Sequence, residues 1–200
     1  MRQQILTIGA TCLLATQVLA SDPLFEPVPL PAPVHVYSGG WEHFVGGGLS
    51  SFACNEDGLP ELLAAGGTSP MRLFLNASQP GSLSFSNGDI PELKGTPGVY
   101  PIDLDSDGWL DLFVLRVGPN AVLKGGSDCS FTQDTMAIDP GNAWSTAFSA
   151  WWTSDGPLLG VGNYVDRADP DGPFEACDTN QLLWSGEDGF RSEVLSPGYC

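Results

Sequence analysis

Basic residues are scarce in this chain of 200 residues, which has 7 lysines and arginines against 24 acidic residues. The formal net charge at pH 7 is −17. A surface of this kind repels nucleic acids and anionic membranes, so neither is expected as a partner. The acidic side chains either solubilise the surface or supply oxygen ligands to hard cations, and their positions decide between the two.

The sequence also lacks the short motifs that mark common active sites. It has no Gly-x-Ser-x-Gly elbow, no His-Glu-x-x-His and no phosphate-binding loop. The two histidines, His35 and His43, have no partner motif, which favours structural roles over general-base catalysis. Paired carboxylates for glycoside hydrolysis stay open, because distances in space are not visible in a sequence. We expect no enzyme and no catalytic residue.

Long apolar runs are missing after the first 20 residues, so no membrane span is expected. Before that point, Arg2 precedes an apolar stretch over residues 5–20, which ends in the modest side chains Val18 and Ala20. This order predicts a secretory signal peptide over residues 1–20, followed by Ser21, and a secreted or periplasmic location. The stretch is too short to anchor the chain across a bilayer of about 30 Å.

Helical periodicity is absent as well. No segment keeps apolar residues at i, i+3, i+4 and i+7 over three turns, and 25 glycines and 17 prolines leave little room for helices. We therefore predict an all-β fold. Alternating prolines in residues 21–36 predict an extended lead-in arm, because proline cannot donate ladder hydrogen bonds.

Five cysteines are present, and Cys12 would leave with the signal peptide. The remaining four favour two disulfides in an oxidising compartment, with three possible connectivities. The preferred pairs are Cys177 with Cys200 and Cys54 with Cys129, although Cys54 could instead be a buried free thiol. No Cys-x-x-Cys pair is present, so a zinc site is poorly supported.

From residue 37 onward the chain repeats itself. Asp-Gly pairs recur at spacings of 50 and then 48 residues, at positions 57–58, 107–108 and 155–156. Each pair precedes an apolar, strand-like run, at residues 62–65, 112–115 and 158–161. A second short strand follows in each unit, at residues 71–75, 120–123 and, after an insert over residues 167–178, at residues 180–184. Each unit closes on a phenylalanine in a polar turn, namely Phe85, Phe131 and Phe190.

A period near 50 with several short strands per unit is typical of β-propeller blades. We predict about three four-stranded blades, over residues 37–95, 96–140 and 141–200. Three blades cannot close a ring, so we expect the chain to be the N-terminal part of a longer propeller or to assemble with blades of another chain.

The second unit carries a metal-type loop, with the sequence Asp-Leu-Asp-Ser-Asp-Gly-Trp-Leu-Asp over residues 103–111. Carboxylates stand at loop positions 1, 3, 5 and 9, as Asp103, Asp105, Asp107 and Asp111. A glycine at position 6 permits a tight turn, and Trp109 at position 7 would offer its backbone carbonyl. This spacing supplies oxygen ligands for calcium, whereas a plain solvated turn needs no such periodicity.

The other units carry altered copies of this loop. In residues 53–61, Ala53 occupies position 1, while Asn55, Asp57 and Glu61 keep oxygens at positions 3, 5 and 9 and Leu59 stands where the second loop has Trp109. We expect this to be a weaker calcium site, because fewer charged ligands lower the affinity. The third copy keeps only Asp155, so we expect it to be structural.

The loop, the apolar strand after it and the period of about 50 resemble FG-GAP/VCBS repeats of integrin-α-like propellers. Residues 46–76 and 162–167 further resemble exported bacterial proteins of the ASPIC/UnbV (cartilage-acidic-protein-like) group. The resemblance covers roughly residue 41 to the end. It implies a seven-bladed propeller that binds calcium at its blade loops and serves in adhesion or extracellular binding, with an unknown protein or glycan ligand.

A lectin or carbohydrate-active enzyme that uses one propeller face is the alternative. Five tryptophans could stack on sugars, namely Trp109, Trp144, Trp151, Trp152 and Trp184. Stacked blades need such aromatic residues in their cores, so packing is the favoured role.

Overall fold

The computed structural model describes residues 25–134, 136–169, 176–186 and 189–196. The proposed signal peptide and Cys200 lie outside these residues. Within them the chain forms thirteen strands and two short 3₁₀ turns, η1 (Trp41–His43) and η2 (Ser127–Cys129). No helix in this part is long and apolar enough to cross a membrane. The all-β prediction is confirmed.

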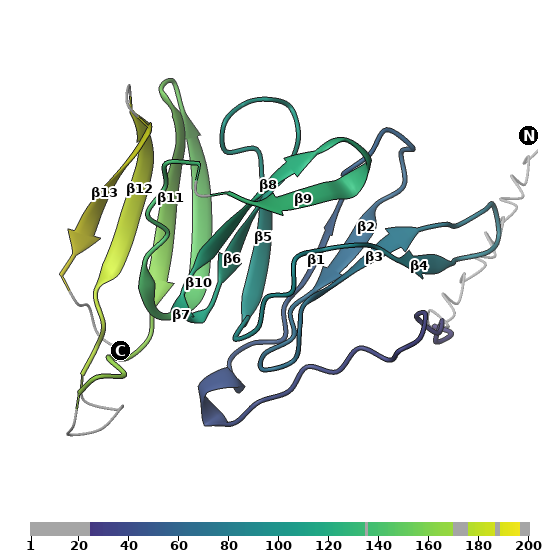
Figure 1. Cartoon of the computed structure of the whole chain (residues 1–200), viewed down its shortest axis with the longest axis horizontal. Coiled ribbons are helices and arrows are strands. Elements are labelled where there is room, and N and C mark those ends of the chain that lie inside the picture. The colour runs from purple at the N-terminus through teal and green to yellow at the C-terminus, as the bar shows by residue number, and fades with distance from the viewer. Residues whose placement is uncertain (1–24, 135, 170–175, 187–188, 197–200) are drawn as a thin grey trace, which may run out of the picture.

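The strands form three antiparallel sheets that lie side by side (Figure 1). The first sheet has the order β1 (Leu49–Phe52), β2 (Glu61–Ala64), β3 (Arg72–Asn76) and β4 (Phe85–Asn87). The second has the order β5 (Gly98–Ile102), β6 (Asp111–Leu115), β8 (Ala121–Gly126) and β9 (Ser130–Gln133). The third has the order β13 (Gly189–Leu195), β12 (Asn180–Gly186), β11 (Gly156–Asn163), β10 (Asn142–Thr153) and β7 (Val117–Pro119). Sheets of four to five strands in this arrangement are consistent with part of a propeller.

Strand β7 crosses from one repeat to the next. It follows β6 in sequence, yet it pairs with the beginning of β10, where Val117 lies opposite Trp144 and Pro119 opposite Asn142. The third sheet therefore has five strands, and the fifth comes from the preceding repeat. The Arg116 backbone carbonyl also accepts a hydrogen bond from Ser145 N–H at 3.2 Å.

Two hydrophobic cores fill the spaces between successive sheets. The first joins sheets one and two and includes Leu63, Leu73 and Leu112. The second joins sheets two and three and includes Phe113 and Leu159. Strand β6 is buried at all five residues because alternate side chains enter opposite cores. This accounts for its uninterrupted apolar sequence after Asp111.

The proline-containing arm lies along the first sheet (Figure 1). His35 Nε2 lies 2.8 Å from the backbone oxygen of Ala65, and the backbone carbonyl of Pro33 accepts a hydrogen bond from Arg72 at 3.0 Å. The His35 ring also contacts Phe74 edge-on, with ring centroids 6.3 Å apart. Phe74 is fully buried as a result, on the side of the sheet that faces away from the second sheet.

The five tryptophans considered for sugar stacking differ in burial, and Trp109 and Trp184 are half-buried. Trp144 is fully buried, between Trp41 and Tyr164, as expected for a packing role. Trp151 and Trp152 are instead 70% and 56% exposed, so neither packs inside a core formed by the described residues. Both lie at the end of β10 next to its hairpin turn, where the strand extends beyond the second sheet.

Candidate metal site

The loop of residues 103–111 joins β5 to β6, and hydrogen bonds from its own backbone shape it. Asp105 Oδ1 accepts the Asp107 N–H at 3.2 Å, and Asp107 Oδ1 accepts the Trp109 N–H at 2.9 Å. Aspartate side chains form this kind of local turn readily. Gly108 has a φ of +92°, which confirms the tight turn expected at position 6.

Three of the four predicted carboxylates converge. Oxygen atoms of Asp103, Asp105 and Asp111 all lie within 4.8 Å of one another. Asp103 Oδ1 is buried and has no hydrogen-bond partner, although Asp103 Oδ2 accepts the Gly108 N–H at 3.1 Å. A buried carboxylate oxygen without a donor is costly unless a cation satisfies it. The all-oxygen donor set and this orphan atom therefore fit calcium, which takes oxygen ligands.

Asp111 is the buried anchor of the loop. Its side chain is fully buried, and its two oxygens accept the N–H groups of Leu104 and Gly125, at 2.9 and 2.8 Å. Burial raises the pKa of this carboxyl, while the two backbone hydrogen bonds oppose that shift. Asp111 therefore ties both ends of the loop to the neighbouring strand β8, in addition to facing the other carboxylates.

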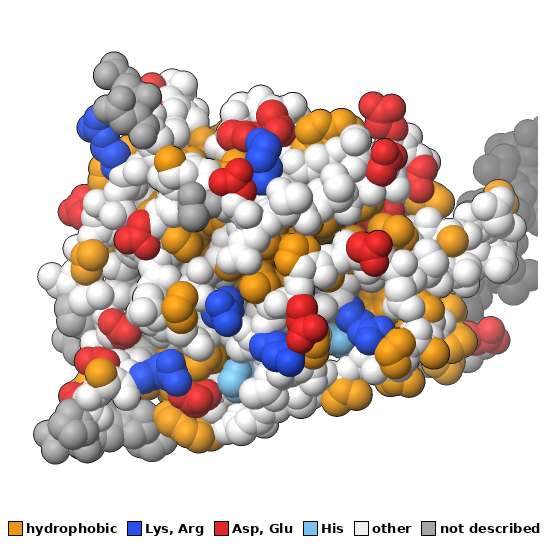
Figure 2. Space-filling view, in the orientation of Figure 1, with side chains coloured by type: hydrophobic (Ala, Val, Ile, Leu, Met, Phe, Trp, Pro, Cys, Tyr) orange, Lys and Arg blue, Asp and Glu red, His pale blue; other side chains and the backbone are white. Residues whose placement is uncertain are grey.

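Asp107 is the carboxylate that does not join the converging group. Its Oδ2 accepts a hydrogen bond from Lys124 Nζ at 2.9 Å, and Lys124 also pairs with Asp105. The hydrogen bond from Lys124 lowers the pKa of Asp107, and the two carboxylates together raise the pKa of Lys124. Figure 2 shows acidic side chains gathered around basic side-chain atoms over this loop, near the top of the view.

Lys124 was not expected from the sequence at this site. It is one of only two lysines in the chain, the other being Lys94. The pairing of β6 with β8 brings it to the loop, because Leu112 lies opposite its neighbour Leu123. The scarcity of lysine in so acidic a chain is the signal that could have drawn attention to it.

The first loop, between β1 and β2, repeats the anchor but not the full ligand set. Glu61 is fully buried and accepts the Cys54 N–H at 3.1 Å, as Asp111 accepts that of Leu104. Asn55 Oδ1 accepts the Asp57 N–H at 3.1 Å, and Asp57 Oδ1 accepts the Leu59 N–H at 2.7 Å. The local turns of the two loops therefore match, while Ala53 contributes no side-chain oxygen at position 1.

Cys54, Glu61 and Cys129 also lie close enough together to suggest a metal group, but the two cysteines are joined in a disulfide. Their sulfurs are therefore not available as thiolate ligands. The predicted pair is confirmed, with Cα atoms 4.8 Å apart, and the free-thiol alternative for Cys54 is excluded. Cys177 is disulfide-bonded as well, while its predicted partner Cys200 lies outside the described residues.

The third copy is not a loop of nine residues. Thr153 pairs with Gly156 across a two-residue turn, and Trp151 and Leu159 lie within the flanking strands β10 and β11. The Asp155 N–H donates to Thr153 Oγ1 at 3.1 Å, which closes the turn. This hairpin gathers no carboxylates, in line with its expected structural role.

Each of the three repeat units places a turn before a strand in the interior of its sheet, namely β2, β6 and β11. Residues 54–114 match the family model of the FG-GAP-like repeat. The matched segment runs from the first loop through the second loop and most of β6. None of the curated proteins matches the chain significantly.

Proposed function

We propose that this chain is an exported, calcium-binding repeat protein of the β-propeller type that serves as an extracellular binding or adhesion module. The observation that carries the proposal is the convergence of three carboxylates, one with a buried unpartnered oxygen, in a loop inside the FG-GAP-like repeat. The strong negative charge of the chain argues against a nucleic acid as its partner, so we propose an extracellular protein or glycan as the ligand.

Calcium would be held by the carboxylates of Asp103, Asp105, Asp107 and Asp111 and by the backbone carbonyl of Trp109. Bound there, the ion would offset the repulsion between neighbouring carboxylates and fix the β5–β6 connection. Since the loop contacts β8 through Asp111, it would stiffen one end of the second sheet. The first loop, with Asn55, Asp57, Leu59 and Glu61, would be the weaker second site.

Export is supported by the Cys54–Cys129 disulfide, because such bonds persist in oxidising compartments. The signal peptide proposed for residues 1–20 would deliver the chain to a secreted or periplasmic location. We further propose, from the sequence alone, a relation to exported proteins of the ASPIC/UnbV group.

The outward face of the third sheet supports the presence of further blades. Trp151, Leu158 and Trp184 lie in one cross-strand row on the face opposite the one that meets the second sheet. The equivalent faces of sheets one and two are each covered by the next sheet. We propose that another blade of a seven-bladed ring, from a longer chain or a second chain, covers this face.

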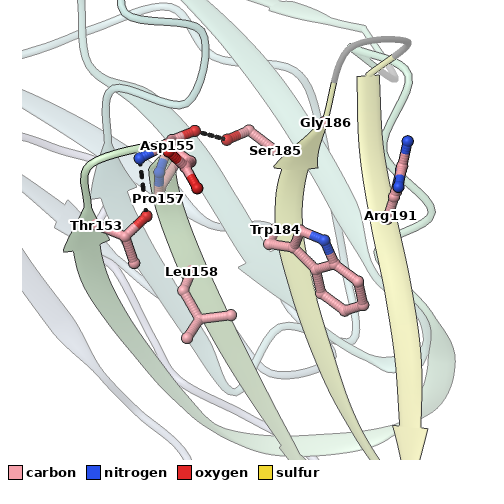
Figure 3. Close-up of a pocket in the computed structure, with 8 residues that line it drawn as sticks. All are labelled: Thr153, Asp155, Pro157, Leu158, Trp184, Ser185, Gly186 and Arg191. Carbon is pink, nitrogen blue, oxygen red and sulfur yellow. Dashed lines mark hydrogen bonds between the residues drawn. The ribbon is translucent and has the colours of Figure 1, made fainter.

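Glycan binding is the second candidate, and a pocket of about 840 Å³ at the end of the third sheet favours it. Because Leu158 and Trp184 line this pocket, glycan binding there is an alternative to a blade that covers the same face. Figure 3 shows the indole of Trp184 and the side chain of Arg191 on the adjacent strands β12 and β13, with Asp155 on the turn nearby. An aromatic ring beside charged and hydroxyl groups is suited to a sugar. Trp184→Ala should then abolish polysaccharide binding measured by calorimetry. Equal binding by the wild type and Trp184→Ala would remove this candidate.

Catalysis is not part of the proposal. The two histidines do not face a common pocket, since His35 Nε2 is hydrogen-bonded to the Ala65 carbonyl and His43 is the buried residue of η1. The organised carboxylates are better explained by a cation than by proton transfer.

Calorimetric titration with calcium tests the main proposal. The wild type should release or absorb heat at one strong site, and Asp105→Ala should remove that heat because it deletes one of the converging ligands. Calcium at a hundred times its dissociation constant should raise the free energy of unfolding by about 2.7 kcal/mol. Asp155→Ala, in the exposed turn of the third sheet, is the matched control and should bind calcium as the wild type does. A wild type with no heat and no thermal shift would end the calcium proposal.

A further inference from the structure

Lys124 occupies a position that a calcium site does not need. It projects from β8 to the 103–111 loop, where its ammonium bridges Asp105 and Asp107. All three side chains are about one-third exposed, so water and ions reach them. A positive charge here stands beside two of the carboxylates that are proposed to hold a divalent cation.

We propose that Lys124 is a built-in competitor for calcium at this loop, an inference that rests on the calcium function proposed above. In the structure its ammonium serves as the counter-ion of Asp105 and Asp107. It also holds Asp107 outside the group formed by Asp103, Asp105 and Asp111. Calcium recruits Asp107 only by breaking that contact. The lysine therefore stabilises the calcium-free loop and weakens the site.

The first loop gives an internal comparison. Phe74 lies opposite Leu62 in the first sheet in the same way that Leu123 lies opposite Leu112 in the second. The residue that corresponds to Lys124 is therefore Leu75, which carries no charge. Of these two loops, only the one with the full set of four carboxylates therefore has a lysine beside it. Like-charge repulsion in the absence of a cation is greatest in that loop.

The size of the effect follows from the charges. A divalent ion and an ammonium about 5 Å apart repel each other enough, even in water, to change an equilibrium constant by about tenfold. Removing the ammonium also leaves Asp107 free to turn toward the ion, and Asp105 loses a competing partner. We therefore expect Lys124→Met, which keeps most of the length of the side chain but not its charge, to bind calcium about tenfold more tightly.

The experiment is a calcium titration of the full chain by calorimetry, with the wild type, Lys124→Met and Lys124→Arg. Lys124→Arg keeps the charge and should stay within about twofold of the wild type. Lys94→Met is the matched control, because Lys94 pairs with Glu92 on the exposed surface and not with the loop. Thermal melts in chelator should give a lower midpoint for Lys124→Met than for the wild type, since the loop loses its internal counter-ion. Lys124→Gln serves as a second neutral variant if the methionine variant does not fold.

Each outcome separates the inference from the function on which it rests. Tighter binding by Lys124→Met than by the wild type supports the competitor. Binding by Lys124→Met alone supports the competitor as well, but it overturns the calcium function proposed for the wild type. Equal or weaker binding by Lys124→Met overturns the competitor and leaves the calcium function standing. No binding by any variant overturns both.

Discussion

Replacing Cys54 and Cys129 together with alanine should lower the free energy of unfolding by about 4 kcal/mol. The bond joins residues 75 positions apart, so it removes much of the conformational freedom of the unfolded chain. It links the loop before β2 to the turn before β9, and both sulfurs are buried beside the first core. Guanidinium denaturation under non-reducing conditions measures the loss.

The single variant Cys129→Ala is the appropriate comparison, because it breaks the same bond and leaves one buried thiol. It should lose nearly as much stability as the double variant. A loss below about 1 kcal/mol in the double variant would contradict the role assigned to this disulfide.

Asp111→Ala should produce two losses at once, about 3 kcal/mol of stability without calcium and all calcium binding at the second loop. The first loss arises because the buried N–H groups of Leu104 and Gly125 lose their acceptor. Each unsatisfied buried donor costs about 1–3 kcal/mol. The second loss arises because Asp111 belongs to the converging carboxylates. Denaturation in chelator and calorimetry with calcium measure the two effects separately.

Asp107→Ala is the matched control for the structural part of this prediction. Asp107 is exposed and contacts Lys124 at the surface, where an ion pair contributes at most about 1 kcal/mol. It should weaken calcium binding yet leave the calcium-free protein close to the stability of the wild type. Similar losses of stability in Asp107→Ala and Asp111→Ala would contradict the anchoring role of Asp111.

The strands next to the repeated turns could be predicted from the sequence because their signals are local. The apolar run after Asp111 became β6, and even the delayed strand after the insert became β12 (Asn180–Gly186). Side-chain alternation and turn residues encode these elements within a few positions. The disulfide between Cys54 and Cys129 could also be predicted, because pairing Cys177 with Cys200 leaves only these two of the four remaining cysteines.

The remaining features depend on contacts between segments that are distant in sequence. Position 9 was expected only to close a ligand shell, but in both loops its carboxylate also binds the backbone N–H of position 2. Lys124 enters the site only through the register of β6 with β8. His43 lies in η1, where its ring packs against Gly39. None of these contacts produces a periodic pattern of residues in the sequence.

The crossing of β7 into the third sheet affects how this protein can be dissected. A fragment that ends at residue 140 would leave β7 (Val117–Pro119) without β10, the strand to which it is hydrogen-bonded. The same truncation would separate the two sides of the second core. Recombinant fragments that stop at a repeat boundary should therefore be prone to aggregation, and swapping single repeats between related proteins requires β7 to travel with the third sheet.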